Sequence, residues 1–268
     1  MSTSSDQLPA QPAPRPWPLA PEPEPLFGLP EVLFVFLAAL LALLVCGELA
    51  LVIAHHLPSL SRIRSADLAP VDPTDDPRVL LPAQLAAYLL IFAGLWRLFA
   101  HHFGIGFFRA LSWRWPPRWF LFLAAGALLG LAVQFTSNWL PTPPELPIDK
   151  MLRTASDAWL MTAFGILIAP FAEEVFFRGL LFPALTRRTG ALASMLVTSL
   201  LFGAIHAPQL SGAWIQITCI IFVGCVLTAV RWRFHSLASS TLVHAGYNGV
   251  LFAVLFIQTR GFTNLSAR

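Results

Sequence analysis

The stretch "FAEEVFFRG" places Glu173, Glu174 and Arg178 inside an otherwise apolar part of the chain. An ionisable side chain within a membrane span is costly and marks a functional site when a partner is at hand. Glu174 and Arg178 are four residues apart with the glutamate first, which is the favoured order for a helical ion pair. This pair leaves Glu173, about 100° away around the helix, without a local partner.

Three further polar residues lie in other apolar stretches: His206, His244 and Asn248. His244 and Asn248 are four residues apart and therefore share a helix face. At about 1.5 Å per residue, Glu173 and His206 lie about 21 and 24 Å from the proposed inner surface, and His244 and Asn248 about 12 and 18 Å. Three helices are thus expected to present polar groups at similar depth.

These residue types suit hydrolysis of an amide without a covalent intermediate. A carboxylate in a low-dielectric site can act as general base toward water, and an imidazole can orient that water. A second imidazole and the Asn248 amide can donate to a developing oxyanion. Alternatively, Glu173, His206 and His244 would hold a divalent metal such as Zn²⁺. No HExxH motif is present, and the metal-free glutamate mechanism is favoured.

The composition is that of a membrane protein. Only 12% of the 268 residues are charged, 56% are hydrophobic, and the mean hydropathy is +0.68; soluble domains carry about 25% charged residues. The net charge of +3 is small and the basic residues are scattered, so a nucleic-acid partner is not expected. The lipid bilayer is the expected surroundings of the chain.

The hydrophobic pattern predicts an all-α, polytopic helical bundle with about seven, or at most eight, transmembrane helices. The expected spans are 31–54, 79–100, 118–140, 157–186, 190–207, 212–231 and 236–258. Pro170, within the fourth span, is expected to kink its helix and to open a cavity beside Glu173, unless it is simply tolerated there.

Four regions are predicted. Residues 1–30 form a proline-rich disordered tail, 31–150 an accessory set of membrane helices, 151–260 the catalytic core, and 261–268 a C-terminal tail. The connectors 187–189 and 231–235 carry four arginines, whereas 208–211 carries none. This bias predicts a cytoplasmic N-terminus in the cell (inner) membrane.

Three motifs occur in order on separate spans: "EEVFFR" at 173–178, "FGAIH" at 202–206 and "HAGYN" at 244–248. They resemble the EExxxR, FxxxH and HxxxN motifs of the CAAX protease and bacteriocin-processing (CPBP) intramembrane proteases. The resemblance covers about residues 157–258. The family includes type II CAAX prenyl endopeptidases, which remove the last three residues after a prenylated cysteine.

The resemblance implies specific roles. Glu173 would activate water, His206 would position that water, and His244 with Asn248 would form the oxyanion site, while Glu174 and Arg178 would support the helix geometry. The expected partner is a membrane-associated protein or peptide substrate. Family members are often labelled metalloproteases, so both the glutamate and the metal mechanism stay open at this point.

Two other functions fit the same residues. A transporter or proton relay would use the buried Glu/His set without hydrolysis, but it often shows inverted repeats, and none is visible. A protease-like scaffold would bind peptides without cutting them, but none of the motif residues is missing.

Overall fold

The computed structural model describes residues 27–56, 72–137, 139–140 and 147–265. Across these ranges the chain is helical and contains no strand. The expected proline-rich tail at 1–30 lies almost entirely outside the described residues.

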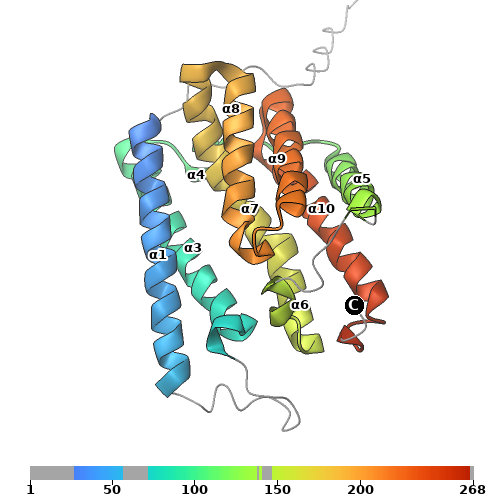
Figure 1. Cartoon of the computed structure of the whole chain (residues 1–268). Coiled ribbons are helices and arrows are strands. Elements are labelled where there is room, and N and C mark those ends of the chain that lie inside the picture. Colours follow the sequence, from blue (N-terminus) through green and yellow to red (C-terminus); the bar gives the residue numbers. More distant parts are fainter. Residues whose placement is uncertain (1–26, 57–71, 138, 141–146, 266–268) are drawn as a thin grey trace, which may run out of the picture.

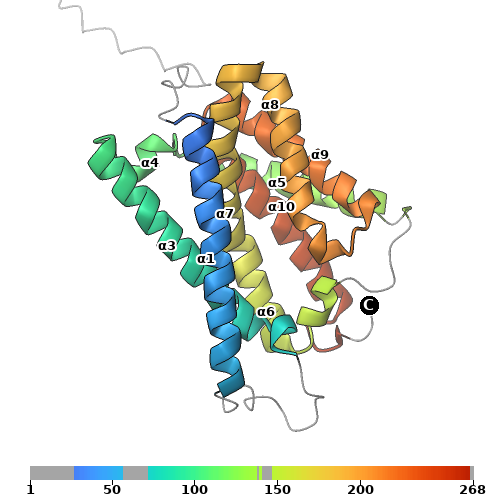
Figure 2. The same cartoon turned by 60° about the vertical axis from the view of Figure 1, so that its left-hand side comes forward.

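The helices pack together in a bundle (Figures 1 and 2). The main α-helical segments are α1 (Leu29–His56), α3 (Pro77–His102), α5 (Trp119–Ser137), α6 (Ala155–Ala163), α7 (Ala169–Glu174), α8 (Phe182–His206), α9 (Trp214–Phe234) and α10 (Leu237–Gln258). The other described elements are η1 (Pro73–Asp75), α4 (Phe107–Ala110), η2 (Pro147–Met151), η3 (Phe164–Ile168), η4 (Val175–Leu181) and η5 (Pro208–Leu210).

In the described part of the chain, six helices are long and apolar enough to cross a membrane. Large apolar side chains point outward from them; on α1, for example, Phe34 is 72% exposed and Leu41 62%. In a soluble protein such surface would be unfavourable, but lipid chains solvate it. The expectation of a multi-pass helical bundle is confirmed, and this is an integral membrane protein.

One of the six candidates, Ala155–His206, is 52 residues long and contains both the fourth and the fifth expected spans. Gly190, at φ 76° and ψ 168°, breaks the helical backbone within α8. A positive φ is accessible to glycine without the Cβ clash that other residues suffer. The α8 ribbon therefore folds back on itself (Figure 1), and its second limb ends at His206.

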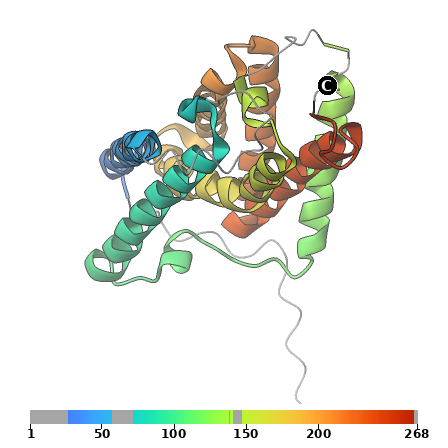
Figure 3. The same ribbon diagram turned by 90° about the horizontal axis from the view of Figure 1, so that it is seen from below.

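Helices α5 and α10 cross at very close range, as the view from below shows (Figure 3). A Cβ on Gly126 would lie 2.0 Å from the Val243 carbonyl oxygen, and one on Gly246 would lie 2.3 Å from that of Leu123. Small residues permit such backbone contact between membrane helices, where van der Waals packing and interhelical hydrogen bonds drive association. This crossing fixes the position of α10, which carries His244 and Asn248.

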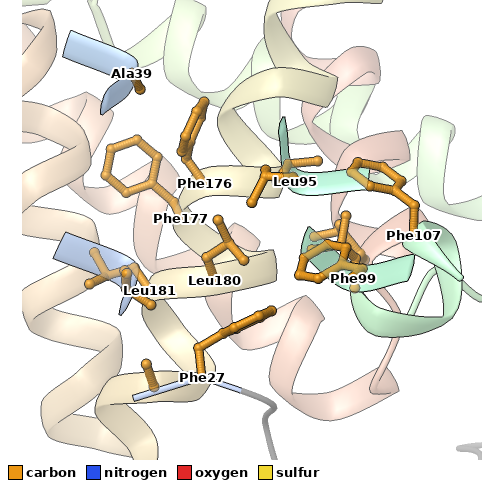
Figure 4. Packing of buried hydrophobic residues seen from close by; sticks show 14 of the residues in the cluster. Phe27, Ala39, Leu95, Phe99, Phe107, Phe176, Phe177, Leu180 and Leu181 are labelled. Atoms are coloured by element: carbon orange, nitrogen blue, oxygen red, sulfur yellow. The ribbon is translucent and has the colours of Figure 1, made fainter. Parts of the chain in front are cut away.

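An aromatic cluster joins α1 and α3 to the helix that follows the glutamates (Figure 4). Phe36 packs edge-on against Phe176 and Phe177, with ring centroids 5.6 and 5.7 Å apart. Phe99 is fully buried in the same cluster. The N-terminal helices thus pack directly against the segment that begins after Glu174.

Candidate active site

Two π-helical segments flank the glutamates. Glu173 and Glu174 end the short helix α7, with η3 before it and η4 after it. π-Helical turns are rare and occur frequently at functional sites. They change the register of the helix, so the spacing rules of a regular α-helix do not hold throughout this segment.

The π-helix η3 lies directly before Pro170, the residue at which a kink was expected. The Ala169 N–H donates to the carbonyl of Phe164, five residues earlier. Two open apolar grooves, of about 600 and 300 Å³, lie between α3 and α4 and beside α10. Neither is lined by Glu173, so neither is the cavity expected next to Pro170.

Glu174 and Arg178 form the predicted ion pair. Arg178 Nη1 lies 2.9 Å from Glu174 Oε1, and both side chains are fully buried. Arg178 also donates to the Gly224 carbonyl at 2.9 Å and to the Thr228 hydroxyl at 3.2 Å. Its guanidinium lies 4.5 Å from the centroid of the Phe202 ring. A buried charge needs such partners, and here they tie the helix of the glutamates to α8 and α9.

His244 lies between the two glutamates. Its Nδ1 is 3.1 Å from Glu174 Oε1, and its Nε2 is 3.6 Å from Glu173 Oε2. Glu174 therefore has a second partner that its spacing from Arg178 did not indicate. Glu173 differs from Glu174 in access: its side chain is 18% exposed, whereas that of Glu174 is 0%.

His206 takes a position near these residues without joining Glu173. Its Nδ1 lies 2.7 Å from the Phe202 carbonyl oxygen, which can only accept, so Nδ1 is the donor. The Phe202 ring packs against both imidazoles, with centroids 4.8 Å from His206 and 5.8 Å from His244. Within the described ranges, no ion pair links His206 to either glutamate.

Asn248 is held by a hydrogen bond to the backbone of η3. Its Nδ2 donates to the carbonyl of Gly165, in η3, at 2.7 Å. An amide has two N–H donors, so this bond uses one of them. The four polar residues expected to meet lie on α7, α8 and α10. Glu173 and His244 approach each other, whereas His206 and Asn248 are hydrogen-bonded to backbone carbonyls.

The metal alternative requires Glu173, His206 and His244 to converge. Among the described residues, no group of three or more His, Cys, Asp or Glu side chains is arranged to hold a metal ion. Glu173 and His244 approach each other, but His206 does not complete a three-ligand set. As the described side chains are placed, they do not form a three-ligand metal site.

Tyr88, on α3, is a residue of this region that the motifs did not indicate. Its ring stacks on Phe164 with centroids 6.2 Å apart, and its hydroxyl accepts from Gln84 at 2.7 Å. It lies within electrostatic range of Glu173. One feature of the sequence could have drawn attention to Tyr88: the chain has only two tyrosines, and this one lies inside a predicted span.

A comparison with known families identifies the segment that carries this geometry. Residues 155–250 match the family described as "Type II CAAX prenyl endopeptidase Rce1-like". This segment is an Rce1-like domain. No match to the chain is found among curated proteins or among solved structures.

The Rce1-like domain begins with α6 and ends within α10, so it includes all three motifs and the residues placed above. The matched family is one of CAAX-type membrane endopeptidases, which are hydrolases. Helices α1, α3 and α5 lie outside the matched residues.

Proposed function

We propose that this protein is an intramembrane endopeptidase that hydrolyses a peptide bond of a membrane-associated or prenylated, CAAX-type substrate, with Glu173 as the base that activates water. The observation that carries this proposal is the difference between the two adjacent glutamates. Glu174 is enclosed and paired with Arg178, whereas Glu173 retains some exposure and faces His244 at 3.6 Å. Of these two glutamates, only Glu173 has a carboxylate that water and substrate can reach.

Glu173 acts as general base in this mechanism. It removes a proton from water as the oxygen attacks the scissile carbonyl carbon, and the same proton later passes to the leaving amine. A positioned base of this kind contributes about 10²–10⁴-fold to the rate. The low-dielectric surroundings strengthen the interaction between the carboxylate and the polar groups around it.

His206 positions the water. Because its Nδ1 donates to Phe202, the neutral imidazole presents Nε2 as an acceptor. An acceptor at this place can hold the second hydrogen of the water while Glu173 takes the first. The packing of His206 and His244 against the same Phe202 ring supports this role.

His244 and Asn248 stabilise the oxyanion. The Nδ1–H of His244 donates to Glu174, which fixes the ring orientation, and in this mechanism the other ring nitrogen, Nε2, carries the N–H that donates to the oxyanion. Asn248 supplies the N–H that Gly165 does not use. Removing one such donor typically lowers kcat by about 10²–10³-fold. Glu174 and Arg178 are the structural support of this arrangement.

The proposed setting is the cell (inner) membrane with the N-terminus in the cytoplasm, and the substrate reaches the site from the bilayer. The proposed mechanism needs no metal ion, because Glu173 activates the water directly. Hydrolysis adds one water across the amide bond and yields a free carboxylate and a free amine.

The test uses the purified full-length protein in lipid vesicles. A fluorescent CAAX peptide is offered with and without its prenyl group, and the products are identified by mass spectrometry. We expect release of the last three residues from the prenylated peptide. If no peptide is cut while the vesicles show proton movement that depends on Glu173, the proton-relay alternative replaces the protease.

A further inference from the structure

Pro170 leaves a backbone carbonyl without a helical donor. In a regular α-helix the carbonyl of Gly165 accepts from residue 169, but the Ala169 N–H donates to Phe164 instead. In the π-register the donor would be residue 170, which is proline and has no N–H. The Gly165 carbonyl instead accepts a hydrogen bond from Asn248 Nδ2 at 2.7 Å.

The same arrangement recurs in the next turns of the helix. The Phe182 N–H donates to Phe177, five residues earlier, and position 183 is again a proline. The carbonyl of Arg178, five residues before Pro183, accepts from Arg231 Nε at 3.2 Å. Each of the two prolines thus frees a carbonyl, and that carbonyl accepts a hydrogen bond from a side chain on another helix.

An unsatisfied carbonyl inside a bilayer is strongly unfavourable, so a side-chain donor from a neighbouring helix stabilises each freed carbonyl. The Asn248 amide can rotate about its terminal bonds, which have broad preferences. A fixed acceptor at 2.7 Å removes that freedom and leaves the second N–H in one direction.

We propose that Pro170 is a positioning residue for the reaction: by leaving the Gly165 carbonyl free, it holds the Asn248 amide in the orientation that the oxyanion requires. The inference rests on the proposed function for its catalytic consequence. The structural coupling between residues 170 and 248 stands apart from any activity. Pro183 provides the matched case, because the carbonyl that it frees holds Arg231 and not a group assigned to the reaction.

The first test is a double-mutant cycle on thermal stability. Asn248→Ala removes the donor to Gly165 and is expected to lower Tm. Pro170→Ala supplies a backbone N–H that the Gly165 carbonyl can accept in the π-register. The fall in Tm caused by Asn248→Ala is therefore expected to be at least halved in the Pro170→Ala background. Equal falls in both backgrounds would overturn the coupling, whether or not the protein cuts peptides.

The second test is kinetic and uses the same variants in vesicles. Pro170→Ala is expected to lower kcat about tenfold or more, with KM and Tm nearly unchanged, because the new N–H competes with the amide for Gly165. The double variant is expected to match Asn248→Ala alone, since both act through one side chain. Pro183→Ala, the control, is expected to keep the wild-type kcat.

Three outcomes contradict the inference. Unchanged kcat in Pro170→Ala would show that the freed carbonyl does not orient a reacting group. A double variant far slower than Asn248→Ala would show that Pro170 acts by another route, such as displacement of the glutamates. An equal loss of kcat in Pro183→Ala would indicate a general effect of helix register. An inactive wild-type protein would instead count against the proposed function, and the stability cycle would still decide the coupling.

Discussion

The Nε2 of His244 lies 3.6 Å from Glu173 Oε2, while the other nitrogen of the same ring contacts Glu174. One imidazole on α10 therefore joins two carboxylates that point in different directions from α7. Glu174 is also paired with Arg178, so it has two partners, whereas His244 is the contact given for Glu173. The arrangement separates a buried carboxylate that orients the ring from a partly exposed one that meets the water.

The buried ion pair predicts a large effect of Glu174 on stability. Glu174→Gln leaves the Arg178 charge buried without its partner and is expected to cost about 3–5 kcal/mol of unfolding free energy. Urea or thermal unfolding in vesicles measures it. Replacing both residues, as Glu174→Gln with Arg178→Met, is expected to recover part of the loss. A single variant as stable as wild type would contradict the role of the pair.

The two histidines are expected to differ when each is replaced. His206→Ala removes a ring that is only partly buried and hydrogen-bonded within its own helix, so kcat falls about 10²-fold or more with little change in Tm. His244→Ala also leaves Glu174 short of a partner and lowers both kcat and Tm. Peptide-cleavage kinetics and unfolding of the same preparations compare them. Equal losses of stability in the two variants would contradict the expectation that His244 stabilises the fold more than His206 does.

The α5–α10 crossing predicts a sharp contrast between two glycines on one helix. Gly246→Ala places a methyl group against the Leu123 carbonyl and is expected to destabilise the fold by about 1–3 kcal/mol or more. Gly249→Ala meets nothing within 4 Å and is expected to be neutral or stabilising by up to about 1 kcal/mol. Thermal unfolding separates the two. Similar Tm values would contradict the close crossing.

Metal removal is expected to leave the activity intact. The proposed mechanism uses Glu173 to activate water, so protein treated with a chelator and then dialysed should cut the prenylated peptide at the untreated rate. Metal content is measured in the same samples. Loss of activity that returns with added Zn²⁺ would overturn the metal-free mechanism.

Several of these features were predictable from spacing alone. The four-residue interval between Glu174 and Arg178 predicted their ion pair. The polar positions on three apolar stretches indicated which helices carry the site residues. Both patterns follow from the α-helical repeat and from the cost of charge in lipid. The role of His206 in positioning water stays a prediction.

The rest depended on information that spacing does not carry. The contact between His244 and Glu174 joins residues that are 70 positions apart, and the hydrogen bond from Asn248 to Gly165 spans 83. Both require the relative rotation of two helices, which the glycine crossing of α5 and α10 helps to set. The π-helices shift the backbone by one residue, so a pattern read at 3.6 residues per turn assigns some side chains to the wrong face.

The central claim is that Glu173 activates the water, and the most direct measurement is the single-turnover cleavage rate of Glu173→Gln. Glu48→Gln is the matched control, because Glu48 is an exposed carboxylate on α1, outside the site. We expect a rate about 10²–10⁴-fold below wild type for Glu173→Gln, with an unchanged Tm, and the wild-type rate for Glu48→Gln. A Glu173→Gln protein that cuts the prenylated peptide at the wild-type rate would contradict the claim.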